Sequence, residues 1–139
     1  MTSPLMIELA PKFFGGDHLV EVAIYDTAEE MLADALEDGF EDLEDSLALC
    51  HGYTDGMVPS VGIRYNREDL TLDIILHELI HAAQHIYRLE YLKLDSQVAD
   101  HIWVGNEDFA HLFSELWAKL DAKLTDLKFY YGNEPEVAE

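Results

Sequence analysis

The feature that most constrains this fold is a helical pattern between residues 69 and 93. Apolar residues recur there at intervals of three and four, which places them on one face of an α-helix. The positions are Leu72, Ile75, Leu76, Leu79, Ala83 and Ile86. Asp69 or Thr71 can cap the start of this helix. A helix with one apolar face must bury that face, so the pattern predicts a domain with its core on one side of the helix.

A second long helix is expected from about residue 106 to about residue 127, again from an apolar stripe at helical spacing. The stripe consists of Phe109, Leu112, Phe113, Leu116, Trp117, Leu120 and Leu124. The first 66 residues read as an acidic part that contains strands and one helix. That helix is capped by Asp26 or Thr27 and ends at Gly39. The strand segments are His18–Tyr25, Ser46–Cys50 and Val61–Tyr65.

These segments predict one α+β domain that spans residues 1–139. We expect a small, mostly antiparallel sheet packed on the helix of residues 69–93 and on the second long helix. The chain has no linker rich in Gly, Pro or Ser and no internal repeat. With 139 residues, it is long enough to bury a core without a disulfide or a structural metal.

The charge balance limits the partners of the chain. It carries 29 Asp+Glu against 8 Lys+Arg, a formal net charge of -21, so direct binding to nucleic-acid phosphates is not expected. A basic protein or peptide suits this charge better. Cys50 is the single cysteine, which fits a reducing compartment. The sequence shows no membrane-spanning apolar run and no signal-peptide pattern, so we expect a cytoplasmic protein without membrane contact.

Residues 77–81 read His-Glu-Leu-Ile-His, the pattern HExxH, inside the first predicted long helix. His77 and His81 are one helical turn apart, so their imidazoles can converge on one Zn²⁺. Glu78 stands beside the first ligand, where it can act as general base toward zinc-activated water. Two His and a carboxylate could also hold Mn²⁺ or Fe²⁺. We therefore expect a metal site, with zinc as the metal and Glu78 as the catalytic residue.

The third metal ligand has several candidates. Glu107 opens the second long helix, on a face lined with small residues that allow close approach to the first helix. His101 and His111 are alternatives from the same part of the chain. His85 continues the series on the first helix, but it is two turns from His77, which is awkward for one tetrahedral metal. We take Glu107 as the leading candidate.

The HExxH motif and the downstream Asn106-Glu107 pair resemble the zincin metallopeptidases, specifically the gluzincin type. The resemblance covers about residues 61–120 and looks similar to small phage or bacterial zincin-like proteins. It implies His77, His81 and Glu107 as zinc ligands and Glu78 as catalytic base. The chain departs from thermolysin-like members four residues after Glu107, where it carries a histidine instead of Asp. The oxyanion-stabilising residue is unassigned, with Tyr130, Tyr131, His101 and His111 as candidates.

The implied chemistry is hydrolysis of a peptide bond in an extended protein or peptide substrate. The strand Val61–Tyr65 precedes the motif helix and could be a sheet edge that pairs with such a substrate. Arg64 and Arg67 are isolated bases in an acidic chain, and local salt bridges explain them better than substrate contacts. Cys50 reads as a small buried residue and not as a nucleophile.

The stretch Asp26–Asp45 supports a different function. It holds ten acidic residues in twenty and no base. The simpler interpretation is a solvated helix face that aids solubility. The other is an acidic interaction or inhibitor protein that mimics nucleic acid, similar to phage anti-restriction proteins, on a zincin-like scaffold whose metal is structural or absent. In that case Glu78→Gln would leave function intact and charge reversal in Asp26–Asp45 would destroy it.

Overall fold

The computed structural model describes residues 3–41, 43, 46–54, 56–92 and 107–127. The elements follow in the order β1 (Leu5–Leu9), the 3-10 helix η1 (Phe13–Gly16), β2 (Val20–Tyr25), α1 (Ala28–Glu37), β3 (Leu49–Gly52), β4 (Val61–Asn66), α2 (Leu72–Leu92) and α4 (Glu107–Asp126). Both predicted long helices are therefore present within two or three residues of their expected bounds. The segment between the two long helices, residues 93–106, and residues 128–139 lie outside the described residues.

The four strands form one mixed sheet in the order β1-β2-β4-β3. β1 pairs with β2 and β3 pairs with β4 in antiparallel fashion, whereas β2 and β4 are parallel. This arrangement confirms the predicted α+β fold with a small, mostly antiparallel sheet. It also corrects one expectation. The strand that begins at Val61 is not a sheet edge, because β2 and β3 occupy both of its sides, and the edge nearest the motif helix is β3.

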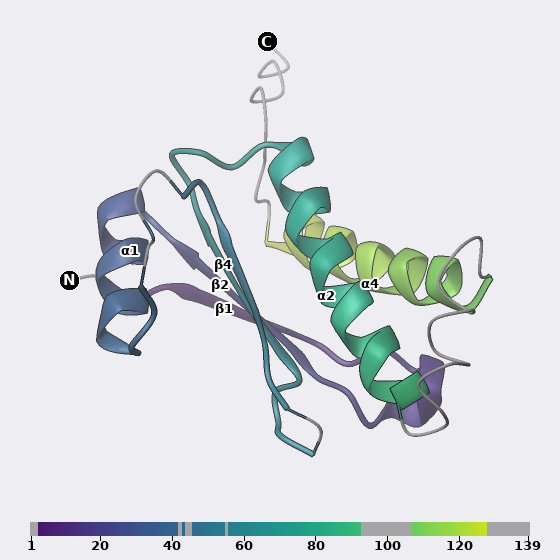
Figure 1. Cartoon of the computed structure of the whole chain (residues 1–139). Coiled ribbons are helices and arrows are strands. Elements are labelled where there is room, and N and C mark those ends of the chain that lie inside the picture. The colour runs from purple at the N-terminus through teal and green to yellow at the C-terminus, as the bar shows by residue number, and fades with distance from the viewer. Residues whose placement is uncertain (1–2, 42, 44–45, 55, 93–106, 128–139) are drawn as a thin grey trace, which may run out of the picture.

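Helices cover the two faces of the sheet unequally (Figure 1). α2 and α4 lie against one face, and α1 lies against the other. Alternate residues of the strands point into the main core under α2 and α4, among them Leu9, Val22 and Ile63. A smaller cluster under α1 contains Met31 and Ala35. The sheet and α4 both pack on α2, and among the described residues the side of α2 that carries His77, Ile80 and His81 is exposed.

Local signals explain where the helices begin. The backbone N–H of Glu30 donates to the hydroxyl of Thr27 over 3.1 Å, which caps α1. The N–H of Ile74 donates to the hydroxyl of Thr71 over 3.2 Å, so Thr71 is the cap at the start of α2. No helix in the described part of the chain has the length and apolar character needed to cross a membrane.

The predicted apolar stripes are largely buried. In α2, the side chains of Ile75, Leu79, Ala83 and Ile86 are at most 1% exposed, and in α4 the same holds for Leu112, Leu116, Leu120 and Leu124. Leu76 is half-buried, and Leu72 is the least covered residue of the stripe, with 41% of its surface exposed. Leu72 is the first residue of α2, where the helix has not yet met its packing partners, so its place in the predicted stripe was wrong.

Candidate metal centre

His77 and His81 lie on the exposed side of α2 with their rings turned toward each other. Their Nε2 atoms are 3.2 Å apart. Two nitrogens that bind one tetrahedral zinc at roughly 2.0–2.1 Å are about 3.3 Å from each other. The pair therefore has the spacing that a shared zinc requires, and a hydrogen bond between two neutral rings gives the same distance.

Glu78 occupies the side of α2 that turns toward the sheet, and only 7% of its surface is exposed. One carboxylate oxygen of Glu78 and one ring nitrogen from each of His77 and His81 all lie within 4.8 Å of one another. Burial raises the pKa of Glu78 above the usual glutamate value, and the two neighbouring histidines partly oppose this shift. A carboxylate that accepts a proton more readily is suited to act as general base near neutral pH.

A groove of about 360 Å³ opens beside this group. Its lining comprises His77, Glu78, Asp73 and Ile74 from α2 and Leu47 and Ala48 from the chain that leads into β3. Leu47 and Ala48 were predicted as part of a strand from Ser46 to Cys50, but β3 begins only at Leu49. His77 and Glu78 therefore border a groove that has room for a ligand next to the start of the edge strand.

The leading third ligand, Glu107, is the first residue of α4, and its side chain lies outside the described residues. Asn106 and His101 also lie outside them. Phe109 packs edge-on against Tyr87, with 5.9 Å between ring centroids, so α4 begins beside the second half of α2. Glu107 and His101 stay predictions as metal ligands.

The two other histidines that were considered have other contacts. His85 Nε2 lies 2.6 Å from the carbonyl oxygen of Tyr53, and a Cβ on Gly52 would collide with the His85 ring. The ring of His111 stacks on Phe13 with centroids 6.1 Å apart. Among the described residues, neither His85 nor His111 belongs to the group formed by His77, Glu78 and His81. Tyr130 and Tyr131, considered for oxyanion stabilisation, lie outside the described residues.

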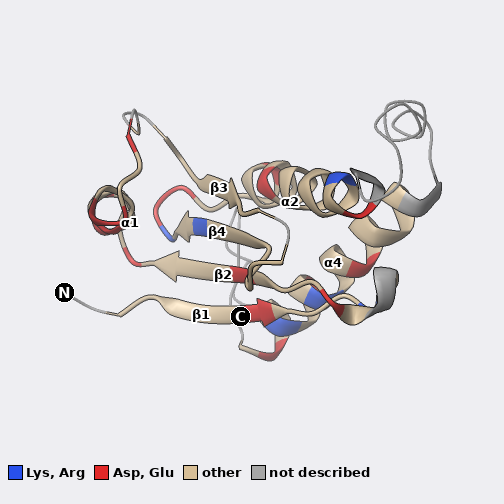
Figure 2. Ribbon diagram, turned by 60° about the horizontal axis from the view of Figure 1, so that its bottom comes forward, with Lys and Arg blue, Asp and Glu red and all other residues tan. Residues whose placement is uncertain are grey.

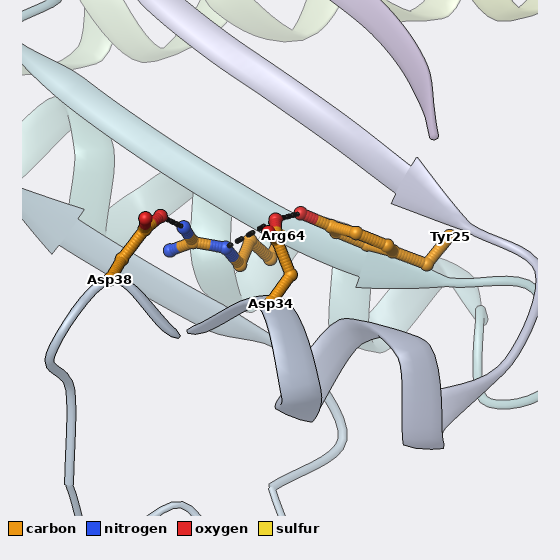
Figure 3. Close-up of polar contacts among 4 residues, drawn as sticks. All are labelled: Tyr25, Asp34, Asp38 and Arg64. Atoms are coloured by element: carbon orange, nitrogen blue, oxygen red, sulfur yellow. Dashed lines mark hydrogen bonds and ion pairs between the residues drawn. The ribbon is translucent and has the colours of Figure 1, made fainter. Parts of the chain in front are cut away.

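Arg64 and Arg67 form local ion pairs, as expected. Arg64 Nη2 donates to Asp38, and its Nε lies 3.9 Å from Asp34, which also accepts a hydrogen bond from the hydroxyl of Tyr25 (Figure 3). Arg67 Nε donates to Asp26 over 3.1 Å. Asp34 on α1 and Asp38 directly after it therefore both contact the arginine of β4, and Figure 2 shows the acidic positions of α1 and the basic position on β4. Three carboxylates of the Asp26–Asp45 stretch are therefore held in ion pairs within the chain.

A second chemical cluster was not found from the sequence. His18 Nδ1 lies 2.9 Å from the hydroxyl of Ser60, and His18 Nε2 lies 2.6 Å from a carboxylate oxygen of Glu90. A serine, a histidine and an acid in one row are typical of nucleophilic catalysis. Ser60 is only 3% exposed, however, so no substrate reaches its hydroxyl. The cluster joins the start of β2 and the start of β4 to the end of α2, and we call it the His18 clasp.

Cys50 is predicted to be unreactive in the folded protein. Burial, with a smaller contribution from the Glu78 charge, raises the pKa of the Cys50 thiol to about 12. Only the thiolate reacts with iodoacetamide, so alkylation at pH 8 should be roughly a hundredfold or more slower in the native than in the urea-unfolded protein. Mass spectrometry of timed samples measures both rates. Equal rates would show that the thiol is accessible and ionised in the fold.

Comparison of the chain with protein-family models, with curated proteins and with solved structures finds no match. Its function must therefore be inferred from the residues of the HExxH helix and from their surroundings.

Proposed function

We propose that this protein is a zinc-dependent metallopeptidase of the zincin type. The observation that carries the proposal is the 3.2 Å spacing of the Nε2 atoms of His77 and His81 beside the buried carboxylate of Glu78. Helical spacing alone puts two such histidines on one face, but it does not turn both rings toward one point. The substrate is a protein or peptide, and the proposed location is the cytoplasm, which suits the single cysteine.

Each residue has a separate role in the proposed reaction. A zinc ion held at this site would polarise the scissile carbonyl and make water more acidic. His77 and His81 would supply two ligands, with Glu107 as the leading third. Glu78 would accept the proton from the attacking water and pass it to the leaving amine. This role is supported by the groove, which both His77 and Glu78 line.

The edge of β3 offers a way to orient the substrate. An edge strand presents unpaired N–H and C=O groups, to which an extended peptide can add as a further strand. β3 continues directly from Leu47 and Ala48, which line the groove next to Glu78. A peptide paired with β3 would therefore pass over the groove, so β3 takes the role that the sequence suggested for the strand beginning at Val61.

The zinc content of the purified protein tests the metal site. We expect about one zinc per chain after gel filtration, and almost none in His77→Ala, because that variant lacks one of two converging ligands. Metal analysis by mass spectrometry measures the ratio. His51→Ala is the matched control. His51 lies on β3 and stacks on Phe40, so the His51→Ala protein should keep its zinc. Equal zinc in His77→Ala and the parent protein would show that the metal binds the acidic surface and not this site.

The same measurement identifies the third ligand. Weaker zinc retention in Glu107→Ala supports the gluzincin-type ligand set. If Glu107→Ala keeps its zinc, the matching variants of His101, His111 and His85 decide among the remaining candidates.

The acidic inhibitor is the weaker alternative. Asp34 and Asp38 are engaged by Arg64, and Asp26 is engaged by Arg67. Carboxylates held in this way are less available to imitate a row of phosphates. The alternative predicts a protein whose binding to a basic partner survives Glu78→Gln.

A further inference from the structure

The groove beside Glu78 combines two kinds of lining. Leu47, Ala48 and Ile74 make its walls apolar, and Asp73 adds a carboxylate from the first turn of α2. Leu47 is 52% exposed, so the groove presents apolar surface that no described part of the chain covers. This lining favours a ligand that is aliphatic along most of its length.

Asp73 supplies a negative charge at the groove. No ion pair found within the described ranges involves Asp73. Its place in the first turn of α2 is favourable for an acid, because the helix dipole is positive there. The dipole accounts for an acid in this turn, but it does not account for an acid that borders an apolar groove.

Lysine and arginine side chains match this combination. Each has an aliphatic stem that packs on apolar surface and a cationic head that remains near polar groups. In the groove, the stem would lie along Leu47 and Ile74 while the head pairs with Asp73. The acidic stretch Asp26–Asp45 ends one residue before Ser46, and the net charge of -21 attracts basic segments over longer distances.

We propose that the groove binds a lysine or arginine side chain of the substrate, next to the bond that is cleaved. This inference rests on the proposed peptidase function, because it treats the bound side chain as part of a substrate. The binding of a basic side chain can nevertheless be measured without turnover. Asp73 is then the specificity-determining residue, and Glu78 remains the base.

The test uses the full-length Glu78→Gln protein, so that no peptide is consumed. Two fluorescent peptides are identical and carry no charged side chain except at one position, which holds either lysine or its uncharged analogue norleucine. We expect the lysine peptide to bind about threefold to fivefold more tightly by fluorescence anisotropy, the upper end for one solvent-exposed ion pair. Adding Asp73→Asn should make the two affinities nearly equal. Adding Asp126→Asn, an exposed position on α4, removes the same charge elsewhere and should leave the preference unchanged.

The outcomes separate this inference from the peptidase proposal. Equal binding of the two peptides, no binding at millimolar concentration, or the same loss of preference in both Asp→Asn variants would overturn the groove assignment. A lysine preference that depends on Asp73 supports the groove even if the parent protein cleaves neither peptide, in which case the peptidase proposal fails. Cleavage by the parent protein without a lysine preference would support the peptidase proposal and overturn the groove assignment.

Discussion

Replacing Glu78 with glutamine should abolish peptide hydrolysis while the zinc content stays the same. Glutamine keeps the size of the side chain but cannot accept the proton of the attacking water, and a lost general base costs roughly 10²–10⁴-fold in rate. His77 and His81 are unchanged, so the metal should remain. The measurement is cleavage of a quenched-fluorescent peptide library, read by mass spectrometry, beside metal analysis of the same samples. Glu37→Gln, an identical substitution at an exposed position of α1, should retain full activity.

Two results would contradict the role of Glu78. Unchanged cleavage in Glu78→Gln would show that another group takes the proton. Loss of both cleavage and zinc would make Glu78 a metal ligand, which its distance from the histidine nitrogens allows.

The metal-free Glu78→Gln protein should also be more stable than the metal-free parent at neutral pH. Burial raises the pKa of Glu78 in the folded protein above its unfolded value. The protonated form is therefore favoured by folding, and this contribution to stability is present at low pH and lost as the pH rises through the folded pKa. Glutamine stays neutral, so the advantage of the variant should appear above the ordinary glutamate range. Urea unfolding with a chelator at several pH values measures it, and an advantage only at low pH would contradict this sign.

Removing one partner of the His18 clasp should lower the free energy of unfolding by about 1–3 kcal/mol. Glu90→Leu leaves His18, which is 5% exposed, with an unpaired nitrogen in the core. A buried polar group without its partner costs about 1–3 kcal/mol. The urea midpoint of the variant measures the loss. The matched change Glu37→Leu should shift stability by no more than about 0.5 kcal/mol.

The double variant His18→Leu/Glu90→Leu tests the coupling between the two residues. It should be more stable than the sum of the two single effects predicts, because neither His18 nor Glu90 is left buried without the other. Strict additivity, or a Glu90→Leu effect no larger than that of the control, would show that the clasp contributes little to folding.

Local patterns explain what the sequence analysis predicted correctly. Helical spacing of apolar residues and a hydroxyl cap are properties of a few neighbouring residues, so α1, α2 and α4 were found near their true bounds. β1 was missed, although Ile7 and Leu9 are buried and Met6 is 49% exposed, which is the alternation of a half-buried strand. Five residues beside a proline gave too short a pattern to stand out.

Long-range contacts explain what was not predicted. The order β1-β2-β4-β3 depends on which strands meet, and neither composition nor periodicity reports that. The HExxH group was visible because its members lie within one helical turn. Leu47 and Ala48 reach the same groove from about thirty residues earlier, and Glu90 reaches His18 from 72 residues later. No local signal marks such residues before the fold is known.

The short length of β3 limits how this protein could hold an extended chain. β3 has four residues, and only alternate residues of an edge strand turn their backbone groups outward. An added strand thus gains hydrogen bonds from two residues, each contributing about 1 kcal/mol. Backbone pairing of this size would bind a peptide only weakly, so the peptide would dissociate quickly. Selectivity would therefore be set by one or two substrate side chains beside the scissile bond. The rest of the peptide sequence would contribute little to selectivity.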